Sequence, residues 1–425
     1  MRNETVAMIL LRRSQIWFAL SLLCFSVAAC GADESGGTIV VPTDEQTIQA
    51  AVDRARTGDI VLIEPGVYNE SVTITTDGIV IRGQDRNKVV LDGQDRLPNG
   101  IYVAADNVRV ENLTARAYTQ NGVVFNGIDE ASGGYGVDPD VAYGTDGRAL
   151  DGYEVRWVTT YNNGLYGIYA FASVNGLIED SYASGHPDSG IYVGQCKPCN
   201  VVVRRVTAET NAIGYYGTNA SGNVFVIEST FTGNRLGVAP NSQEMEKLAP
   251  QSETVVAGNL VTDNDNPRAP AIKEGFFGGG IIIGGGTRNT VVRNRVEGHS
   301  NMGIGIIDFN SFVPIDNRIE GNSVTMNSRD LVYAVRGSTS AEGNCFSRNV
   351  HETSVPEMIE RLLPCDGQPT ALTPYVLSSP TPPPDVDYRK ISAPPAQQSM
   401  PATAMSRPAG TAAFTAPDVS GIALP

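Results

Sequence analysis

Histidine, tryptophan and positive charge are scarce in this chain. Its 425 residues include three histidines, two tryptophans, and 31 lysines and arginines against 46 aspartates and glutamates, which gives a formal net charge of −15 at pH 7. A chain this acidic is poorly suited to a nucleic acid or to an anionic membrane face, so we expect no nucleic-acid partner. It would bind a polyanionic sugar directly only with a divalent cation between them.

A long apolar run occurs only near the N-terminus. Two arginines precede a mostly apolar stretch over residues 16–29, which has the length of a signal-peptide core and is too short for a comfortable membrane span. It ends in Val27-Ala28-Ala29-Cys30, which resembles the lipobox of bacterial lipoproteins and implies cleavage before Cys30 and lipid attachment to its sulfur. Simple secretion after Ala29 is the alternative. We therefore expect an exported protein that is lipid-anchored to the cell envelope, in the periplasm or at the cell surface.

Cysteine is also sparse, with six residues in the whole chain. Cys24 would leave with the signal peptide, and Cys30 would carry the lipid. Export exposes the remaining four to oxidising conditions, and the even number predicts two disulfides. The spacing favours the pairs Cys196–Cys199 and Cys345–Cys365. A zinc site made by the first pair with His186 and Asp188 is the alternative, although structural zinc usually draws on two such pairs.

The middle of the chain repeats. Short runs rich in Val, Ile and Tyr begin with glycine at Gly167, Gly190 and Gly214, at intervals of 23 and 24 residues. Each run is bounded by Gly, Asn or Asp, which is typical of a strand between turns. A constant period near 23 predicts an all-β fold, a right-handed parallel β-helix solenoid in which each coil stacks about 4.8 Å from the last. A β-sandwich is the competing fold, but it needs no fixed coil length.

The two ends of the repeat differ from it. Thr43-Asp44-Glu45-Gln46 has the pattern of a helix capping box, and the apolar residues that follow would form one face of a short N-terminal capping helix. The last 60 residues hold 12 of the 25 prolines, which predicts a disordered tail. We therefore divide the chain into a signal peptide (1–29), a linker (30–37), a β-helix domain (38–365) and a Pro/Ala/Ser-rich tail (366–425).

The stretch TIQAAVDRARTGDIVLIEPGVYNE, at residues 47–70, carries a family resemblance. It resembles the opening of bacterial right-handed parallel β-helix proteins of the pectate-lyase-like superfamily, and the wider resemblance covers about residues 38–350. Pectin methylesterases and the periplasmic copper-insertion protein of nitrous-oxide reductase maturation open in the same way. The resemblance is therefore specific for the fold and poor for the function.

Two catalytic patterns known on this fold are missing from the sequence. Polygalacturonases share N-T-D, D-D, G-H-G and R-I-K motifs, and this chain has no Asp-Asp pair and no G-H-G. The paired aspartates and the L-G-R-P-W run of pectin methylesterases are also missing. Pectate and alginate lyases need calcium-binding carboxylates and an Arg or Lys base without one short signature, so that class stays open.

An acidic insertion at residues 128–151 interrupts the coil rhythm. Calcium prefers six to eight oxygen ligands from a flexible loop, and the composition of the insertion suits that requirement. The spacing matches no known calcium motif, so a solvated acidic loop is the alternative. The candidate calcium ligands are Asp138, Asp140, Asp146 and Asp151.

Tyrosines recur at one position of successive coils. If Ile168 and Ile191 face the core, then Tyr169, Tyr192 and Tyr216 face outward, one above another. Stacked exterior tyrosines offer flat apolar faces with hydroxyl tips, which suit sugar rings. Ordinary stacking of neighbours on one face of a sheet is the alternative.

His186 and Asp188 lie in a turn where neighbouring coils have asparagine. A histidine beside a carboxylate can perform general acid–base catalysis, although a polar turn that replaces asparagine is the favoured interpretation of the pair. With Arg204 as a further candidate base, they complete the candidate catalytic set.

Three functions remain. The first is binding of a polysaccharide or other glycan at the cell envelope. The second is a calcium-dependent polysaccharide lyase or epimerase, and the third is a non-catalytic envelope scaffold or metal-maturation partner. Because no known catalytic set is complete, binding or scaffolding ranks above catalysis.

Overall fold

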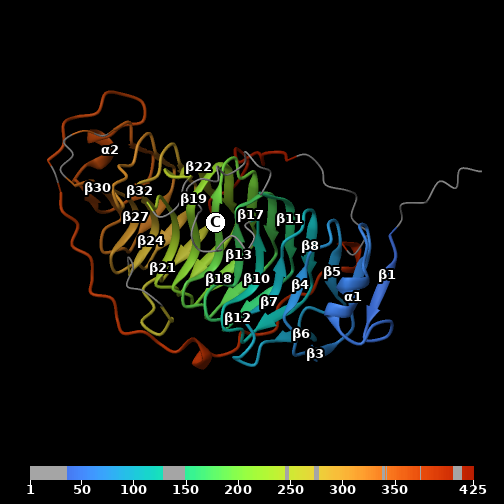
Figure 1. The fold of residues 1–425 in the computed structure, drawn as a ribbon. Coiled ribbons are helices and arrows are strands. Elements are labelled where there is room, and N and C mark those ends of the chain that lie inside the picture. Colours follow the sequence, from blue (N-terminus) through green and yellow to red (C-terminus); the bar gives the residue numbers. More distant parts are fainter. Residues whose placement is uncertain are drawn as a thin grey trace, which may run out of the picture. The chain divides into compact units, whose positions relative to one another are not determined.

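Each coil of the protein passes through three short strands and then begins the next coil. The computed structural model describes residues 36–127, 149–244, 248–271, 277–336, 340, 342–373, 375–404 and 414–425. In this part of the chain, strands that occupy the same place in successive coils pair in parallel and form three sheets, which we name A, B and C (Figure 1). The prediction of an all-β parallel β-helix is confirmed.

The strands fall into these sheets in chain order. Sheet A contains β1 (Thr38–Val41), β2 (Ile60–Ile63), β5 (Val80–Gly83), β8 (Val108–Glu111), β11 (Leu150–Arg156), β14 (Ser173–Glu179), β17 (Val201–Arg204), the second half of β19 (Ile213–Ile227), β22 (Ser252–Ala257), β25 (Thr290–Val292), β28 (Arg318–Glu320) and β31 (Cys345–Ser347). Sheet B contains β3 (Gly66–Tyr68), β6 (Val89–Asp92), β9 (Thr114–Arg116), β12 (Thr159–Tyr161), β15 (Tyr182–Ser184), β18 (Thr207–Glu209), β20 (Thr230–Thr232), β23 (Leu260–Thr262), β26 (Arg295–Glu297), β29 (Ser323–Thr325) and β32 (Val350–His351). Sheet C contains β4 (Val72–Ile74), β7 (Asn99–Val103), β10 (Asn121–Asn126), β13 (Ile168–Phe171), β16 (Ser189–Cys196), the first half of β19, β21 (Leu236–Asn241), β24 (Gly279–Gly284), β27 (Met302–Ile307), β30 (Leu331–Ala334) and β33 (Ser354–Val355).

The interior of the solenoid is filled by alternate residues of every strand. In sheet C, Ile168 pairs in register with Ile191, and both are fully buried. Alternation then turns the next residue of each strand outward. Valine and isoleucine fill much of the interior, together with large rings such as Phe125, Tyr153 and Phe231, and these buried residues form one continuous core.

A ladder of buried polar side chains follows the turn between sheets B and C. An asparagine at this turn accepts, through its side-chain oxygen, two hydrogen bonds from the equivalent residue of the preceding coil. Asn234 Oδ1, for example, accepts from the backbone N–H of Asn211 at 2.9 Å and from its side-chain amide at 3.0 Å. The series comprises Asn163, His186, Asn211, Asn234, Asn264, His299 and Asn327, and it ends on the carboxylate of Asp330. Asn163, Asn211 and Asn234 thus stack along the solenoid axis, whereas Asn301, which also precedes a glycine-led strand, bonds to Phe277 O and leaves its ladder position to His299.

Two of the three histidines are members of this ladder. His186 Nδ1 lies 2.7 Å from Asn211 Oδ1, and its Nε2 lies 3.2 Å from the amide nitrogen of Asn163. The neutral ring with its proton on Nδ1 therefore satisfies both neighbours, whereas a proton on Nε2 would face another donor. Burial lowers the pKa of His186, and likewise that of His299, to about 4.

The N-terminal helix begins later than the sequence predicted. Helix α1 (Ile48–Arg54) is capped by Thr47, whose hydroxyl accepts from Ala50 N at 3.1 Å. The predicted capping box at Thr43–Gln46 is therefore wrong, because the helix begins only at Ile48, where Glu70 from the first coil accepts from the N–H groups of Ile48 and Gln49. The helix packs its buried face on the first coil and covers the core there, as expected.

The other end of the solenoid is closed by a short helix and a disulfide. Helix α2 (Ile359–Leu362) follows the last coil, and the Cys345–Cys365 bond ties its C-terminal side to β31. A second asparagine ladder runs from Asn259 through Asn294 and Asn322 to Asn349, whose amide donates to Glu360 at 2.8 Å. No helix among the described residues is long and apolar enough to cross a membrane.

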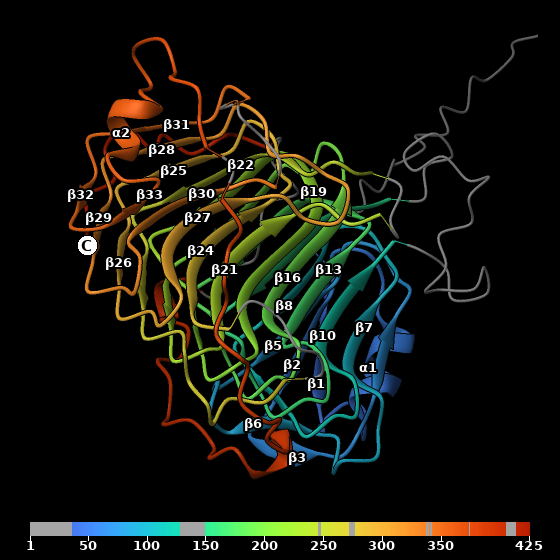
Figure 2. The ribbon, with the colours of Figure 1, turned by 90° about the vertical axis from the view of Figure 1, so that its left-hand side faces the viewer.

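The tail after Cys365 differs from the expected disorder. Its described residues form no strand and only two 3₁₀ turns, η2 (Tyr388–Lys390) and η3 (Ala402–Ala404), as its proline content predicts. It nevertheless lies along the coils, and its Met400 is 3% exposed (Figures 1 and 2). Side-chain donors of the solenoid hold its carbonyls, for example Arg86 to Gln398 O at 3.0 Å. Composition alone could not show this, because the partners are more than 300 residues apart in sequence.

The histidine ladder predicts an acid-dependent stability. Since the folded protein holds His186 and His299 neutral down to about pH 4, the unfolded chain binds more protons between pH 6.5 and 4, and the free energy of unfolding falls as the pH drops through that window. Denaturant unfolding of the His186→Asn/His299→Asn double variant should show a clearly smaller loss across that window. His351→Asn, a histidine outside the ladder, is the control and should retain the wild-type loss. An unchanged pH dependence in the double variant would contradict this assignment.

Candidate functional site

The outer face of sheet C carries a column of aromatic side chains. Tyr169, Tyr192 and Tyr216 occupy paired positions on β13, β16 and β19. The rings of Tyr169 and Tyr192 stack with centroids 4.8 Å apart, and the ring of Tyr216 meets Tyr192 edge-on at 6.0 Å. The predicted register of the three tyrosines is therefore present in the structure. Tyr102 occupies the same column, separated from Tyr169 by Val124.

Two more aromatic residues extend this surface. Tyr166, in the turn before β13, has its ring 4.6 Å from Tyr169 and 5.1 Å from Tyr192. Phe171 stacks on Tyr169 at 5.7 Å. We call Tyr166, Tyr169, Phe171, Tyr192 and Tyr216 the tyrosine surface. Tyr192 is only 4% exposed because Tyr166 and its column neighbours cover it, whereas the other four are half-buried.

Asp188 lies at the edge of the tyrosine surface. Burial raises the pKa of the Tyr166 hydroxyl, and the charge of Asp188 and a hydrogen bond to it raise that pKa further. The hydroxyl therefore stays protonated at neutral pH and serves as a hydrogen-bond donor. This arrangement puts a carboxylate acceptor and phenolic donors around an apolar, aromatic patch.

Polar groups also border the surface at Tyr216. Gln243, in the segment after β21, donates from Nε2 to the Tyr216 hydroxyl at 2.7 Å. Its backbone N–H donates to Asn219 Oδ1 at 3.0 Å, and the Asn219 amide returns a bond to the Gln243 carbonyl at 2.9 Å. On the far side, tail residues Tyr375 and Leu377 pack on the same apolar cluster as Tyr216.

His186 lies apart from this surface. Its side chain is fully buried in the asparagine ladder, and both ring nitrogens are occupied there. Its pKa is about 4, so the ring is neutral at physiological pH. Since both nitrogens already have partners, neither can bond to a substrate. The structure thus separates His186 and Asp188, and the placement favours the interpretation of His186 as a replacement for a ladder asparagine.

Arg204 belongs to sheet A rather than to sheet C. Its Nε donates to Glu179 Oε2 at 2.7 Å, and Arg156 donates to the other oxygen of Glu179 at 2.6 Å. Arg82, Glu111, Arg156, Glu179 and Arg204 occupy paired positions on five successive coils, so charges alternate along the sheet. Burial alone would raise the pKa of Glu179, but the bond from Arg204 and the neighbouring arginine charges lower it. Arg204 is therefore part of an ion-pair ladder, and the structure does not bring it to the tyrosine surface.

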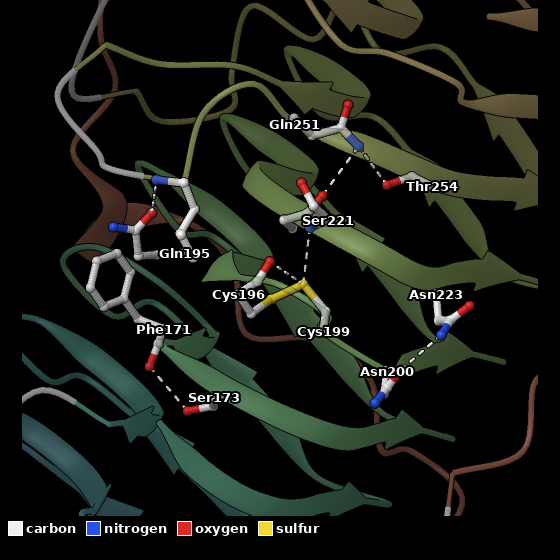
Figure 3. Close-up of a disulfide and its surroundings, with 12 residues drawn as sticks. Phe171, Ser173, Gln195, Cys196, Cys199, Asn200, Ser221, Asn223, Gln251 and Thr254 are labelled. Atoms are coloured by element: carbon white, nitrogen blue, oxygen red, sulfur yellow. Dashed lines mark hydrogen bonds between the residues drawn. A yellow bond between two sulfur atoms is a disulfide. The ribbon is translucent and has the colours of Figure 1, made fainter. Parts of the chain in front are cut away.

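The C-x-x-C motif forms a disulfide at the corner between β16 and β17. Cys196 and Cys199 are both fully buried, and the N–H of Ser221 on the next coil donates to Cys199 Sγ at 3.1 Å (Figure 3). The disulfide prediction is confirmed for both pairs. Since bonded sulfurs are not thiolate ligands, the alternative of a zinc site on this pair does not fit.

Most of the predicted calcium ligands cannot be placed. Asp138, Asp140 and Asp146 lie outside the described residues. Asp151 is exposed, accepts from the Asn175 amide at 2.6 Å, and its backbone N–H donates to Asp106. Among the residues that the structure describes, no group of three or more His, Cys, Asp or Glu side chains could hold a metal ion.

Sequence reasoning missed Tyr166, Phe171 and Gln243. Phe171 could have been found, because it is two residues after Tyr169 on one strand and so shares its face. Tyr166 lies in a turn, and Gln243 comes from another coil, so no strand periodicity marks either residue.

Comparisons with known proteins agree with the fold. No protein-family model matches the sequence, and no curated protein matches it either. Among solved structures, the A-module of the mannuronan C-5 epimerase AlgE4 from Azotobacter vinelandii has a TM-score of 0.51 at 14% identity, over 78% of this chain and 95% of that one. The AlgE6 A-module of the same organism gives 0.46 at 14% identity over 72% and 92%, and the pectate lyase Pel9A gives 0.44 at 12% over 75% and 78%.

At this level of identity, the AlgE4 comparison establishes a shared fold and leaves the activity open. The protein therefore has a parallel β-helix fold, which is the fold that the resemblance at residues 47–70 implied.

Proposed function

We propose that the protein binds a polysaccharide or other glycan along the outer face of sheet C. The observation that carries this proposal is the register of Tyr169, Tyr192 and Tyr216 on three successive coils. Because the coils repeat along the solenoid axis, an extended glycan lying along that axis would meet the half-buried rings of Tyr169 and Tyr216, while the buried Tyr192 packs between them. Sugar rings pack their C–H faces on such rings and direct their hydroxyls to polar groups at the edge.

The polar border supports binding more than catalysis. Asp188 can accept hydrogen bonds from sugar hydroxyls, and the tyrosine hydroxyls can donate or accept. A general base is harder to find, because the pKa of Tyr166 is raised and His186 is enclosed in the ladder. Binding of a neutral or weakly charged glycan also agrees with the net charge of −15.

The second candidate function is a lyase or epimerase. The fold is shared with a module named as a mannuronan C-5 epimerase. On the outer face of sheet C, the carboxylate of Asp188 and the Tyr166 hydroxyl bonded to it are the candidate acid–base pair. Calcium would have to come from carboxylates such as those of the 128–151 insertion. Incubation with a panel of uronate polymers plus calcium separates the two functions. Unsaturated products or inverted sugars would show catalysis, whereas a polymer that stays bound to the protein and is not modified would show binding.

Export and lipid attachment at Cys30 complete the proposal. The two disulfides fit an oxidising compartment. We expect the wild-type protein to incorporate a labelled fatty acid in a bacterial host and to fractionate with membranes. Cys30→Ala should abolish both, and Cys24→Ala should abolish neither. Labelling that persists in Cys30→Ala would contradict the anchor.

Substitution within the tyrosine surface tests the glycan site. Tyr169→Ala removes a half-buried ring from the centre of the surface, and we expect roughly tenfold weaker binding of any glycan identified on an array, from the loss of one stacking contact. Tyr102→Ala is the matched control, because Tyr102 shares the column but lies beyond Val124. Affinities would be measured by calorimetry. The proposal fails if no glycan binds, or if Tyr169→Ala binds as tightly as the wild type.

A further inference from the structure

The returning tail borders a half-open cavity on the outer face of sheet B. The cavity has a volume of about 570 Å³, within the range of small-molecule sites. The solenoid contributes β15, β18 and the segment after β23, and the tail contributes residues 386–395. The lining side chains used below are Tyr182, Ser184, Glu209, Val386, Ile391 and Pro394.

The floor of the cavity is polar and aromatic. Tyr182 and Ser184 point outward from β15, since Ala183 between them lies in the core. The Tyr182 hydroxyl donates to the carboxylate of Glu209. Ser184 is 3% exposed and lies beside the Tyr182 hydroxyl on the floor of the cavity.

The roof of the cavity is the apolar side of the tail. Val386, Ile391 and Pro394 face a floor that carries hydroxyl, carboxylate and aromatic groups. Arg268 and Lys390 are exposed and lie at the rim. One polar wall and one apolar wall suit a ligand with a hydroxylated edge and a C–H face, which is the chemistry of a sugar ring.

The tail is held in place by groups that recognise its backbone. Arg235 donates to the carbonyls of Pro383 and Pro384 at 2.9 and 2.7 Å, and Asn162 donates to Ile391 O at 2.7 Å. Proline has no N–H, so a proline-rich segment cannot pair as a strand and offers mainly carbonyls to such donors. These bonds are non-covalent, and no disulfide among the described residues ties the chain down after Cys365.

A glycine shapes the seat of the tail. Gly185 has φ of +72°, and a Cβ at that position would lie 3.3 Å from the Ile391 Cβ and 2.2 Å from Asn162 Oδ1. Any larger residue would therefore push apart the pair that docks the tail beside the cavity.

We propose that this cavity is a second ligand site, built for a saccharide of one or two rings, and that residues 386–395 act as its lid. The site lies on sheet B, whereas the tyrosine surface lies on sheet C. It therefore stands whether or not the tyrosine surface binds a glycan.

The test uses the full-length protein and three probes: glucose, glucuronate and cellobiose. Binding is measured by calorimetry, and lid closure by the rate of tryptic cleavage after Arg389 and Lys390. We expect at least one probe to bind and to slow that cleavage. Ser184→Leu fills the cavity and should weaken binding at least tenfold. Tyr182→Phe keeps the ring but removes its bond to Glu209, and should weaken binding several-fold without releasing the tail.

Tyr161→Phe is the matched control, because Tyr161 pairs with Ser184 on the neighbouring coil but lies outside the cavity. It should bind the probe as the wild type does. The proposal is overturned if none of the three probes binds, or if Ser184→Leu and Tyr182→Phe both bind as tightly as the wild type. Binding that is lost in Tyr169→Ala but kept in Ser184→Leu also overturns it, because the probe would then occupy the tyrosine surface.

Discussion

The stacking of one coil on the next in fixed register is the constraint on which the rest of the structure depends. Parallel pairing places equivalent residues of successive coils about 4.8 Å apart, so side chains of one type at one coil position form a continuous row along the solenoid. Apolar residues become a continuous core, asparagines become a hydrogen-bonded ladder, and alternating Arg and Glu become an ion-pair ladder. The same rule aligns Tyr169, Tyr192 and Tyr216. A slip of one residue would turn each of these series to the wrong face.

The asparagine ladder decides between a catalytic and a structural role for His186. A side chain that must accept from the coil before it and donate to the coil after it can be asparagine or neutral histidine, but not a charged imidazolium. This explains why His186 and His299 lie in equivalent environments although only His186 precedes a carboxylate by two residues. The coil after Asn327 has Thr353 in place of an asparagine, and Asp330 supplies the acceptor for the Asn327 amide instead. The carboxylates at the ends of the ladders are thus explained by the fold and need no catalytic role.

Much of the fold could be predicted because its cause is local and repeated. The glycines that open the runs at Gly167, Gly190 and Gly214 mark the coil length, and the outward position of Tyr169 follows from the inward position of Ile168. The start of the capping helix could not be predicted, because its first N–H groups bond to Glu70, which lies 22 residues after Ile48 in the sequence. The order of the tail could not be predicted either, because its partners Arg86 and Arg235 lie far away in sequence. For the same reason the sequence could not reveal Tyr166 as a member of the tyrosine surface, since a turn has no periodicity.

The central claim is that a glycan lies along sheet C over the tyrosine surface. A crystal structure of the protein soaked with an oligosaccharide selected by array would test it most directly. The account predicts sugar rings stacked over Tyr169 and Tyr216, with the chain direction parallel to the solenoid axis and hydroxyls near Asp188. An oligosaccharide bound only on the ion-pair ladder of sheet A, or crossing the coils without touching these tyrosines, would contradict it.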